Sequence, residues 1–381
     1  MRFSRDAPRA LIVSIVVVVA AIAAASNAIL GATTRSIERS QLATMRSIVE
    51  SYLQDASSNA LARAEILAQT TCLRSALAAR DRQALLRETQ AMFLDQREKY
   101  AVEQVQFHLP PATSFLRLHA PELHGDDLSA FRPMISSVNR EHISRRGLEI
   151  SRTGPGIFGV APMSDLDGRH LGSVEVGIDF GSVLDRLKAA HGLELTFFVE
   201  EQPLREGAYA MRHGVLTEAN RVGHLIRYHS TNWALMQRLV HAEDLRVLDE
   251  PEGFVRDALG VTYGVLVLPV RSGAGQEIGA IVVAEDFSAT RAATGRSRVL
   301  EGLLAVFGIV LLSGIVLVVI RGFLLRPLAS ITQRFARTRA GEHVPVDPED
   351  AKLCTEMKEL AAEHERLVAS RAQAAPGSEA P

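Results

Sequence analysis

The residues PMSDLDGRHLGSVEVGIDF (Pro162–Phe180) and PVRSGAGQEIGAIVVAEDF (Pro269–Phe287) decide the fold, because the second stretch repeats the pattern of the first 107 positions later without a gap. Both stretches begin with proline, end with Asp-Phe and carry glycine at two matching places. In each copy apolar residues alternate with others after a glycine turn, which is typical of a β-hairpin. Unless two unrelated hairpins resemble each other by chance, the chain contains two copies of one α/β module in series.

Two long apolar runs enclose the repeat. No charged residue occurs from Ala10 to Leu30, and a second apolar run extends from Gly302 to Ile320. About 20 apolar residues are enough to cross a bilayer core as a helix. We therefore expect transmembrane helices over residues 10–31 and 299–321. A cleaved signal peptide is the alternative for the first run.

Arginines lie on the terminal side of each apolar run. By the positive-inside rule, both termini are expected in the cytoplasm and about residues 32–298 outside it. Cys72 and Cys354 would then lie on opposite sides of the membrane and cannot pair. The formal net charge of -2 gives no reason to expect nucleic acid as a partner.

A helical pattern follows the first run. Apolar residues recur at three- and four-residue steps from Met45 to Ala64. Since no helix breaker follows Gly31, we expect the helix to continue directly from the membrane span. A second helix is expected over about residues 81–99, before strand patterns take over. Further along, Asp127 or Ser129 is expected to cap a helix with an apolar stripe between residues 128 and 138.

A long helix followed by two such modules resembles the double-Cache class of extracytoplasmic sensor domains, found in chemotaxis receptors, sensor histidine kinases and diguanylate cyclases. The resemblance is strongest in FHLPPATSFLRLHAPELHGDDLSAFRPMISSVN (Phe107–Asn139), GLEISRTGPGIFGVAP (147–162) and GSVEVG (172–177). It implies an α+β fold, with two tandem PAS-like modules on a long N-terminal helix, in a bacterial inner (plasma) membrane. The expected parts are a cytoplasmic tail (1–9), the long helix with the membrane-distal module (32–183) and the membrane-proximal module (184–298).

The segment after the second run resembles a HAMP signal-relay domain, expected over residues 322–368 and followed by a disordered tail (369–381). TEMKELA (355–361) is similar to the entry of the second HAMP helix, although Lys358 stands where glycine is usual. A coiled-coil stripe needs partner helices, so at least a parallel homodimer is expected. An ordinary juxtamembrane helix pair is the alternative. The expected relay residues are Pro327, Leu328, Ile331, Glu356, Met357 and Leu360.

Candidate ligand-binding residues gather in the first module. Phe115, Arg117 and His119 share one face of an expected strand over 113–119, because side chains alternate between the faces of a strand. The planar, permanently charged fork of arginine suits carboxylate or phosphate. We expect a pocket for a small anionic or zwitterionic ligand, with Arg117 as its main anchor; alternatively, Arg117 only neutralises Glu149 or Glu175. The candidate residues are Phe107, His108, Phe115, Arg117, His119, Arg132, Glu149, Arg152 and Glu175, with Tyr263, Arg271 and Asp286 as weaker candidates in the second module.

Enzyme chemistry is the less favoured interpretation of the same residues. His108 and His119 with Asp126 or Asp127 are candidate zinc ligands, but their spacing matches no compact metal motif. No nucleophile elbow surrounds Ser114, which argues against a serine triad. We expect no catalytic residue, cofactor or metal ion.

The leading hypothesis is therefore a non-enzymatic transmembrane sensor that binds a small extracytoplasmic ligand and signals through the second span and the HAMP-like segment. Because no kinase, cyclase or methyl-accepting segment follows residue 367, the output is expected from a separate cytoplasmic protein, unless the chain is a truncated receptor. The alternatives are a structural membrane protein that scaffolds a complex and, third, a metal-dependent hydrolase.

Overall fold

The computed structural model describes residues 3–208, 211, 214–246, 250–273, 275–339, 359, 362, 363 and 366. The chain divides into two compact units. The central unit comprises Arg35–Arg291, and the terminal unit comprises residues 1–34 together with 292–381. Each unit is described below by itself.

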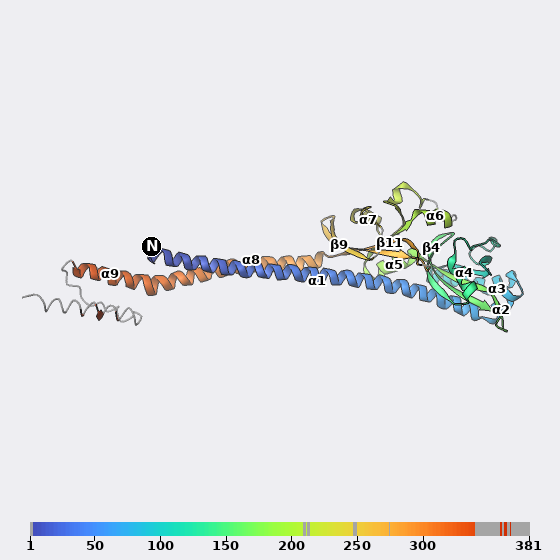
Figure 1. Ribbon diagram of the computed structural model, residues 1–381, viewed down its shortest axis with the longest axis horizontal. Coiled ribbons are helices and arrows are strands. Elements are labelled where there is room, and N and C mark those ends of the chain that lie inside the picture. Colours follow the sequence, from blue (N-terminus) through green and yellow to red (C-terminus); the bar gives the residue numbers. More distant parts are fainter. Residues whose placement is uncertain are drawn as a thin grey trace, which may run out of the picture. The chain divides into compact units, whose positions relative to one another are not determined.

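Helix α1 (Phe3–Gln69) is uninterrupted, which confirms that the helix continues from the first apolar run. Within the central unit it buries Met45, Val49, Ala60 and Ala64, so one stripe of the helix packs into the core. α2 (Thr71–Ala78) follows as a separate short helix, and α3 (Arg82–Tyr100) is the second helix expected over about residues 81–99. The end of the central unit that carries α2 and α3 also carries α4 (Pro133–Glu141) (Figure 1).

The first module is a five-stranded antiparallel sheet with the order β2-β1-β5-β4-β3. Helix α5 (Phe180–His191) follows its last strand and is capped by Asp179, whose carboxylate accepts a hydrogen bond from Ser182 N at 2.7 Å. Its strands are β1 (Val102–Leu109), β2 (Thr113–Arg117), β3 (Arg145–Ser151), β4 (Gly154–Ser164) and β5 (His170–Asp179).

The second module is a six-stranded antiparallel sheet with the order β7-β8-β6-β11-β10-β9. Its strands are β6 (Glu194–Glu200), β7 (Arg221–Val222), β8 (Leu225–Ser230), β9 (Glu252–Ala258), β10 (Val261–Arg271) and β11 (Glu277–Asp286). Its helices are α6 (Glu201–Gly207), a single 3₁₀ turn (Glu218–Asn220) and α7 (Trp233–Leu239).

The structure confirms the internal repeat. The order β8-β6-β11-β10-β9 reproduces β2-β1-β5-β4-β3, and each quoted stretch forms the hairpin that ends its module. Gly172 and Gly279 share φ values of 155° and 151°, and a Cβ at either would overlap the facing carbonyl oxygen, that of His108 or Phe198. Only glycine fits such an approach, so the matching glycines mark the same backbone geometry twice.

The two sheets differ in the side chains on one face. In the first module Val105, Phe107, Val174 and Val176 belong to the core that contains α1, while the alternate positions carry buried polar groups. Those polar residues on β1 and β5 are Gln104, Gln106, His108, Ser173 and Glu175, each less than 9 % exposed.

The matching face of the second module is apolar. Counted 107 positions on, Ser173 and Glu175 are replaced by Ala280 and Val282, which pack with Phe198 and Met236 in a separate core. Burial of a polar group is costly unless it is hydrogen-bonded or paired. Strands β1 and β5 of the first module bury five polar side chains on this face, whereas β11 of the second module carries alanine and valine there. The polar face of the first module is therefore the place to look for a binding site.

The terminal unit contains apolar helices. Among the described residues, two helical stretches, Arg9–Gln69 and Ser288–Gly322, are long and apolar enough to cross a membrane. Large apolar side chains such as Val17, Ile22, Phe307 and Val318 are more than half exposed on them.

The expected relay segment is described only in part. After α8 (Ser288–Val319) and one π-helical segment (Ile320–Leu325), α9 (Arg326–Arg339) begins one residue before Pro327, and it buries Ile331 while Leu328 is 38 % exposed. Glu356, Met357 and Leu360 lie outside the described residues.

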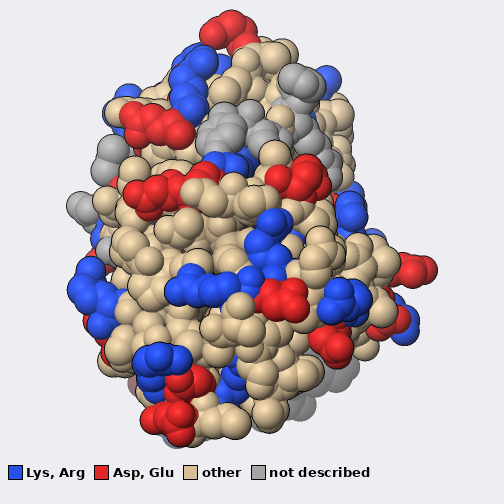
Figure 2. Space-filling view, turned by 90° about the vertical axis from the view of Figure 1, so that its right-hand side faces the viewer, with Lys and Arg blue, Asp and Glu red and all other residues tan. Residues whose placement is uncertain are grey.

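Charge is mixed over the end of the central unit that carries α2, α3 and α4. Figure 2 shows basic and acidic side chains intermingled among uncharged ones over the described surface of this face. Two exposed ion pairs lie on the helices of this end, Lys99–Asp95 on α3 and Arg140–Glu141 on α4. Over the described surface of this face, no broad basic area is seen.

Candidate functional site

A cavity of about 240 Å³ lies over the polar face of the first sheet. Four of the predicted residues line it, namely Arg117, His119, Arg132 and Arg152. The wall is completed by the loop that follows β2 and by the turn between β3 and β4. The other lining residues are Gln104, Gln106, Ala120, Leu123, Leu128, Phe131, Ser151 and Thr153.

Arg132 holds the centre of the site with two buried carboxylates. Its Nε donates to Glu149 Oε2 at 2.9 Å, and its two Nη atoms donate to the carboxylate of Glu175. Its guanidinium also lies over the ring of Phe158, 4.5 Å from the centroid. Since Glu149 is on β3, Glu175 on β5 and Arg132 immediately before α4, the cluster ties the helix to the sheet.

Burial and charge act in opposite directions on this cluster. Complete burial raises the pKa of Glu175, helped by the charge of Glu149, while Arg132 opposes the rise. Burial would lower the pKa of Arg132, but the charges of Glu175 and Glu149 outweigh it and leave that pKa raised. Arg132 therefore stays charged, and its partners Glu149 and Glu175 occupy its fork.

Arg117 and Arg152 share one carboxylate. Arg117, which is 3 % exposed, donates from Nη1 and Nη2 to the two oxygens of Asp126 at 2.8 Å each, and from Nη1 to the Leu123 carbonyl oxygen at 2.8 Å. Arg152 also donates to Asp126. Burial raises the pKa of Asp126, but the hydrogen bonds and charge of Arg117, with the charge of Arg152, hold it below its ordinary value. The alternative expectation was that Arg117 neutralises Glu149 or Glu175. The carboxylate that forms hydrogen bonds with Arg117 is instead that of Asp126.

The two histidines are neutral near pH 7. Burial, reinforced by Arg117, Arg97 and Arg132, lowers the pKa of His119 to about 4. Burial and the charges of Arg132 and Arg117 lower the pKa of His108 well below its usual value. Nδ1 of His119 is buried, and no described residue offers it a hydrogen bond. His119 therefore presents an uncharged imidazole to the cavity.

Four polar lining residues were missed by the sequence analysis. Gln104 donates to Ser151 Oγ at 2.9 Å and to Thr153 Oγ1 at 2.6 Å, and Gln106 donates to Ser114 Oγ at 2.8 Å. The period-two alternation of glutamine with valine and phenylalanine in VEQVQFHL carries the signal that places Gln104 and Gln106 on one face with His108.

Five candidates from the first module are not among the residues that line the cavity. Phe107 is fully buried in the core, and Phe115 packs against that core. His108 lies deeper, with Nδ1 3.3 Å from Ser173 Oγ. Glu149 and Glu175 act on the cavity through Arg132, so their effect on a ligand is indirect.

The alternative zinc interpretation lacks its geometry among the described residues. Asp127 accepts hydrogen bonds from Ser129 rather than turning toward a histidine, and Asp126 is held by arginines. Within the described parts of the chain, no three His, Cys, Asp or Glu side chains form a group that could hold a metal ion. In the second module Asp286 accepts from Ser288 N at 2.7 Å, as a helix cap does.

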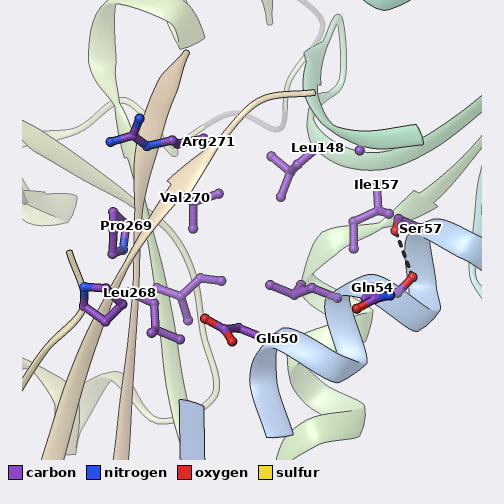
Figure 3. Close-up of a pocket in the computed structure, with 13 residues that line it drawn as sticks. Glu50, Gln54, Ser57, Leu148, Ile157, Leu268, Pro269, Val270 and Arg271 are labelled. Atoms are coloured by element: carbon purple, nitrogen blue, oxygen red, sulfur yellow. Dashed lines mark hydrogen bonds between the residues drawn. The ribbon is translucent and has the colours of Figure 1, made fainter. Parts of the chain in front are cut away.

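A second cavity of about 330 Å³ lies between the two modules and α1. In Figure 3, Glu50, Gln54 and Ser57 from α1 face Leu268, Pro269 and Val270 from β10 across it, and Leu148 and Ile157 of the first sheet close one side. The weaker candidate Arg271 is part of this lining, but Tyr263 and Asp286 line neither cavity. The described lining is mostly apolar, with Glu50 and Arg271 as its charged members, and the cavity lies at the joint between the modules.

The comparisons with known proteins agree with this architecture. A double-Cache family model, described as a double sensory domain of two-component sensor kinases, matches residues 36–289, about two thirds of the chain. None of the curated proteins compared with the chain matches it.

Solved structures to which the chain is similar include sensor domains from several bacteria. The ligand-binding domain of the Campylobacter jejuni chemoreceptor Tlp3, in complex with 4-methylisoleucine, is 13% identical, with 68% of this chain and 92% of that one covered and a TM-score of 0.41. The sensor domain of the Vibrio cholerae histidine kinase DctB is 10% identical (65% and 98% covered, TM-score 0.38). The ligand-binding domain of the Pseudomonas fluorescens chemoreceptor CtaA, in complex with L-serine, is 15% identical (66% and 98% covered, TM-score 0.37).

The extent of the family match, together with the repeated five-stranded sheet on a long helix, leads to one conclusion: the chain belongs to the double-Cache family of double sensory domains.

Proposed function

We propose that this protein is a membrane-bound sensor whose first module binds a small anionic or zwitterionic molecule in the 240 Å³ cavity. The observation that carries the proposal is the contrast between the two modules. The same sheet face is polar and hollowed in the first module, with three arginines in the cavity wall, and is filled by apolar side chains in the second. The cavity is smaller than the roughly 300–1,000 Å³ typical of sites for drug-sized ligands, which suits a small metabolite.

The charges around the cavity favour a ligand of low net charge. Three arginines in its wall are balanced by three carboxylates, Asp126, Glu149 and Glu175. A polyanion would need further cations, and a cationic ligand would meet the guanidinium groups. The guanidinium groups of the wall are hydrogen-bond donors held in fixed positions, and His119 adds a neutral imidazole. Such groups are suited to orienting one small oxyanion or zwitterion.

The joint between the modules offers a route for the signal. Gly273 N, in the turn between β10 and β11, donates to the Leu148 carbonyl oxygen of β3 at 3.0 Å. Gly273 also lies against Met134, whose backbone N–H donates to Glu149 at 2.8 Å. A ligand that shifts Arg132 and Glu149 would therefore act on the second module through the contacts of Glu149 with Met134 and of Met134 with Gly273. The change would bias two arrangements of the membrane helices and the HAMP-like segment in a parallel dimer, and a cytoplasmic partner would read it.

A thermal-shift screen of the full-length protein in detergent tests the binding step. Organic acids, amino acids and amines are added singly, and a ligand at about 100 times its Kd should stabilise the protein by about 2.7 kcal/mol. Ala120→Trp fills the proposed cavity, and Ser57→Trp is the matched change at the second cavity. We expect the ligand-induced rise in Tm to be lost in Ala120→Trp and kept in Ser57→Trp. The reverse result would place the site at the joint, and no response from any compound would favour the structural scaffold.

A further inference from the structure

Asp126 differs from the other two acids of the site by its position. Glu149 and Glu175 lie on central parts of β3 and β5, and their side chains are at most 3% exposed. Asp126 lies on the loop between β2 and α4, at the edge of the cavity, and its side chain is 26% exposed. Of the three carboxylates that hold arginines here, Asp126 alone can turn toward solvent without disturbing a strand.

The backbone around Asp126 is fixed while its side chain bridges two arginines. Ser114 N donates to the Asp126 carbonyl oxygen at 3.0 Å, Gly125 N donates to the Ser114 carbonyl oxygen at 2.7 Å, and Leu128 N donates to the Ala112 carbonyl oxygen at 3.0 Å. These bonds hold the loop on β2. An exchange at Arg117 therefore needs only a rotation of the Asp126 side chain, which costs little compared with unfolding the loop.

The bond that Asp126 makes is the bond that a ligand carboxylate would make. Its two oxygens meet Nη1 and Nη2 of Arg117 in the planar two-point geometry by which arginine recognises carboxylates. A ligand carboxylate on the same fork replaces like with like, so the buried arginine is never left without a counter-charge. A neutral ligand does not compensate the loss of this pair, and an amine meets Arg117 and Arg152 at close range.

We infer that Asp126 is an internal competitor, and that the ligand of the first module carries a carboxylate which displaces Asp126 from Arg117. This inference rests on the proposed binding function and adds the chemical class of the ligand and the residue that sets its affinity. A ligand must compete with Asp126 for the guanidinium group of Arg117. Asp126 therefore weakens ligand binding and sets the ligand concentration at which the sensor responds.

The substitution Asp126→Asn tests the inference, because it keeps the shape and removes the charge that competes. The matched control is Asp127→Asn, since Asp127 is the next residue and contacts Ser129 instead of arginine. Full-length protein in detergent is titrated with acetate, succinate and L-alanine, and with acetamide and ethanolamine as probes without a carboxylate. We expect Asp126→Asn to bind at least one carboxylate with a Kd lower than that of the wild type by about tenfold, a change of about 1.4 kcal/mol. Asp127→Asn should match the wild type.

The sign of the effect separates this inference from its rivals. Weaker carboxylate binding by Asp126→Asn would mean that Asp126 itself holds the ligand, as an acceptor for an ammonium group, and would overturn the inference. Equal affinities, or no carboxylate binding by Asp126→Asn up to 50 mM acetate or succinate, would overturn it too. A wild-type response to acetamide or ethanolamine alone overturns the inference but leaves the sensor function standing. Asp126→Glu is the second variant, because it keeps a counter-charge for Arg117. Its competing carboxylate remains, so no rise in carboxylate affinity is expected, and a gain of about tenfold would overturn the inference.

Discussion

Arg132 and Glu175 meet in the interior of the first module, where their side chains are 3% and 0% exposed. Glu149 completes the cluster and also accepts a hydrogen bond from Met134 N at the start of α4. The three groups join a helix, two strands and the floor of the cavity, so the same contacts stabilise the fold and shape the site.

Removing the cation of this cluster should be severe. In Arg132→Met two buried carboxylates lose their shared counter-charge, and breaking a buried pair in this way typically costs about 3–5 kcal/mol. Arg140→Met is the control, because Arg140 is 70% exposed in its pair with Glu141 and such pairs contribute about 0–1 kcal/mol. Urea unfolding of both variants, followed by circular dichroism, measures the difference. Equal losses of stability would contradict the description of Arg132 as the centre of a buried ion-pair cluster.

The repeated glycines predict a matched pair of substitutions. At Gly172 and Gly279 an alanine Cβ would overlap a carbonyl oxygen in a backbone conformation that L-residues rarely adopt. Each alanine should cost at least the roughly 1–3 kcal/mol of a strained position. Gly168→Ala should cost less, because the space around Gly168 is open although its φ is 86°. If Gly168→Ala lowers Tm as much as Gly172→Ala does, the close approach of the strands at Gly172 contributes nothing to the loss of stability.

Acid should destabilise the first module through its histidines. The pKa of His119 is about 4 when folded and about 6.5 in an unfolded chain, so the unfolded state binds more protons between these values. The contribution of a neutral His119 is therefore complete above pH 6.5 and falls as the pH drops toward 4, by at most about 3 kcal/mol. His119→Gln should flatten the curve of stability against pH in this range. An unchanged slope would show that His119 titrates alike in both states.

The two cysteines test the membrane topology. Cys72 is free and exposed on α2, within the part expected outside the cytoplasm, and Cys354 lies in the segment expected inside. A membrane-impermeant maleimide applied to intact spheroplasts should label Cys354→Ser protein through Cys72. It should label Cys72→Ser protein only after lysis. Labelling of Cys354 in intact spheroplasts would contradict cytoplasmic placement of the C-terminal segment.

Much of the fold could be predicted from the sequence because its signals are periodic. The gapless repeat gave the two modules, and the helical spacing from Met45 to Ala64 gave the long helix. The helix expected from about residue 128 begins only at Pro133, because Leu128 bonds back to Ala112 and Arg132 is drawn to Glu149 and Glu175.

The site was harder to predict because its pairing depends on tertiary structure. Arg117, Arg132 and Arg152 were identified by residue type and position, but nothing local says which acid each one meets. Asp126 reaches Arg117 because of the path of the loop after β2. That path is set by backbone hydrogen bonds to Ser114 and Ala112. The alternation of polar and apolar residues on β1 could have identified Gln104 and Gln106. No sequence pattern indicates the role of Asp126.

Hydrogen exchange measured by mass spectrometry tests the central claim most directly. The full-length protein is compared with and without the compound that raises its Tm the most, and exchange is followed along the chain. We predict slower exchange in β1 and β3 and in the loop after β2, with the largest change in residues 102–109 and 118–132. Protection confined to β6–β11 would contradict the claim that the first module is the sensor.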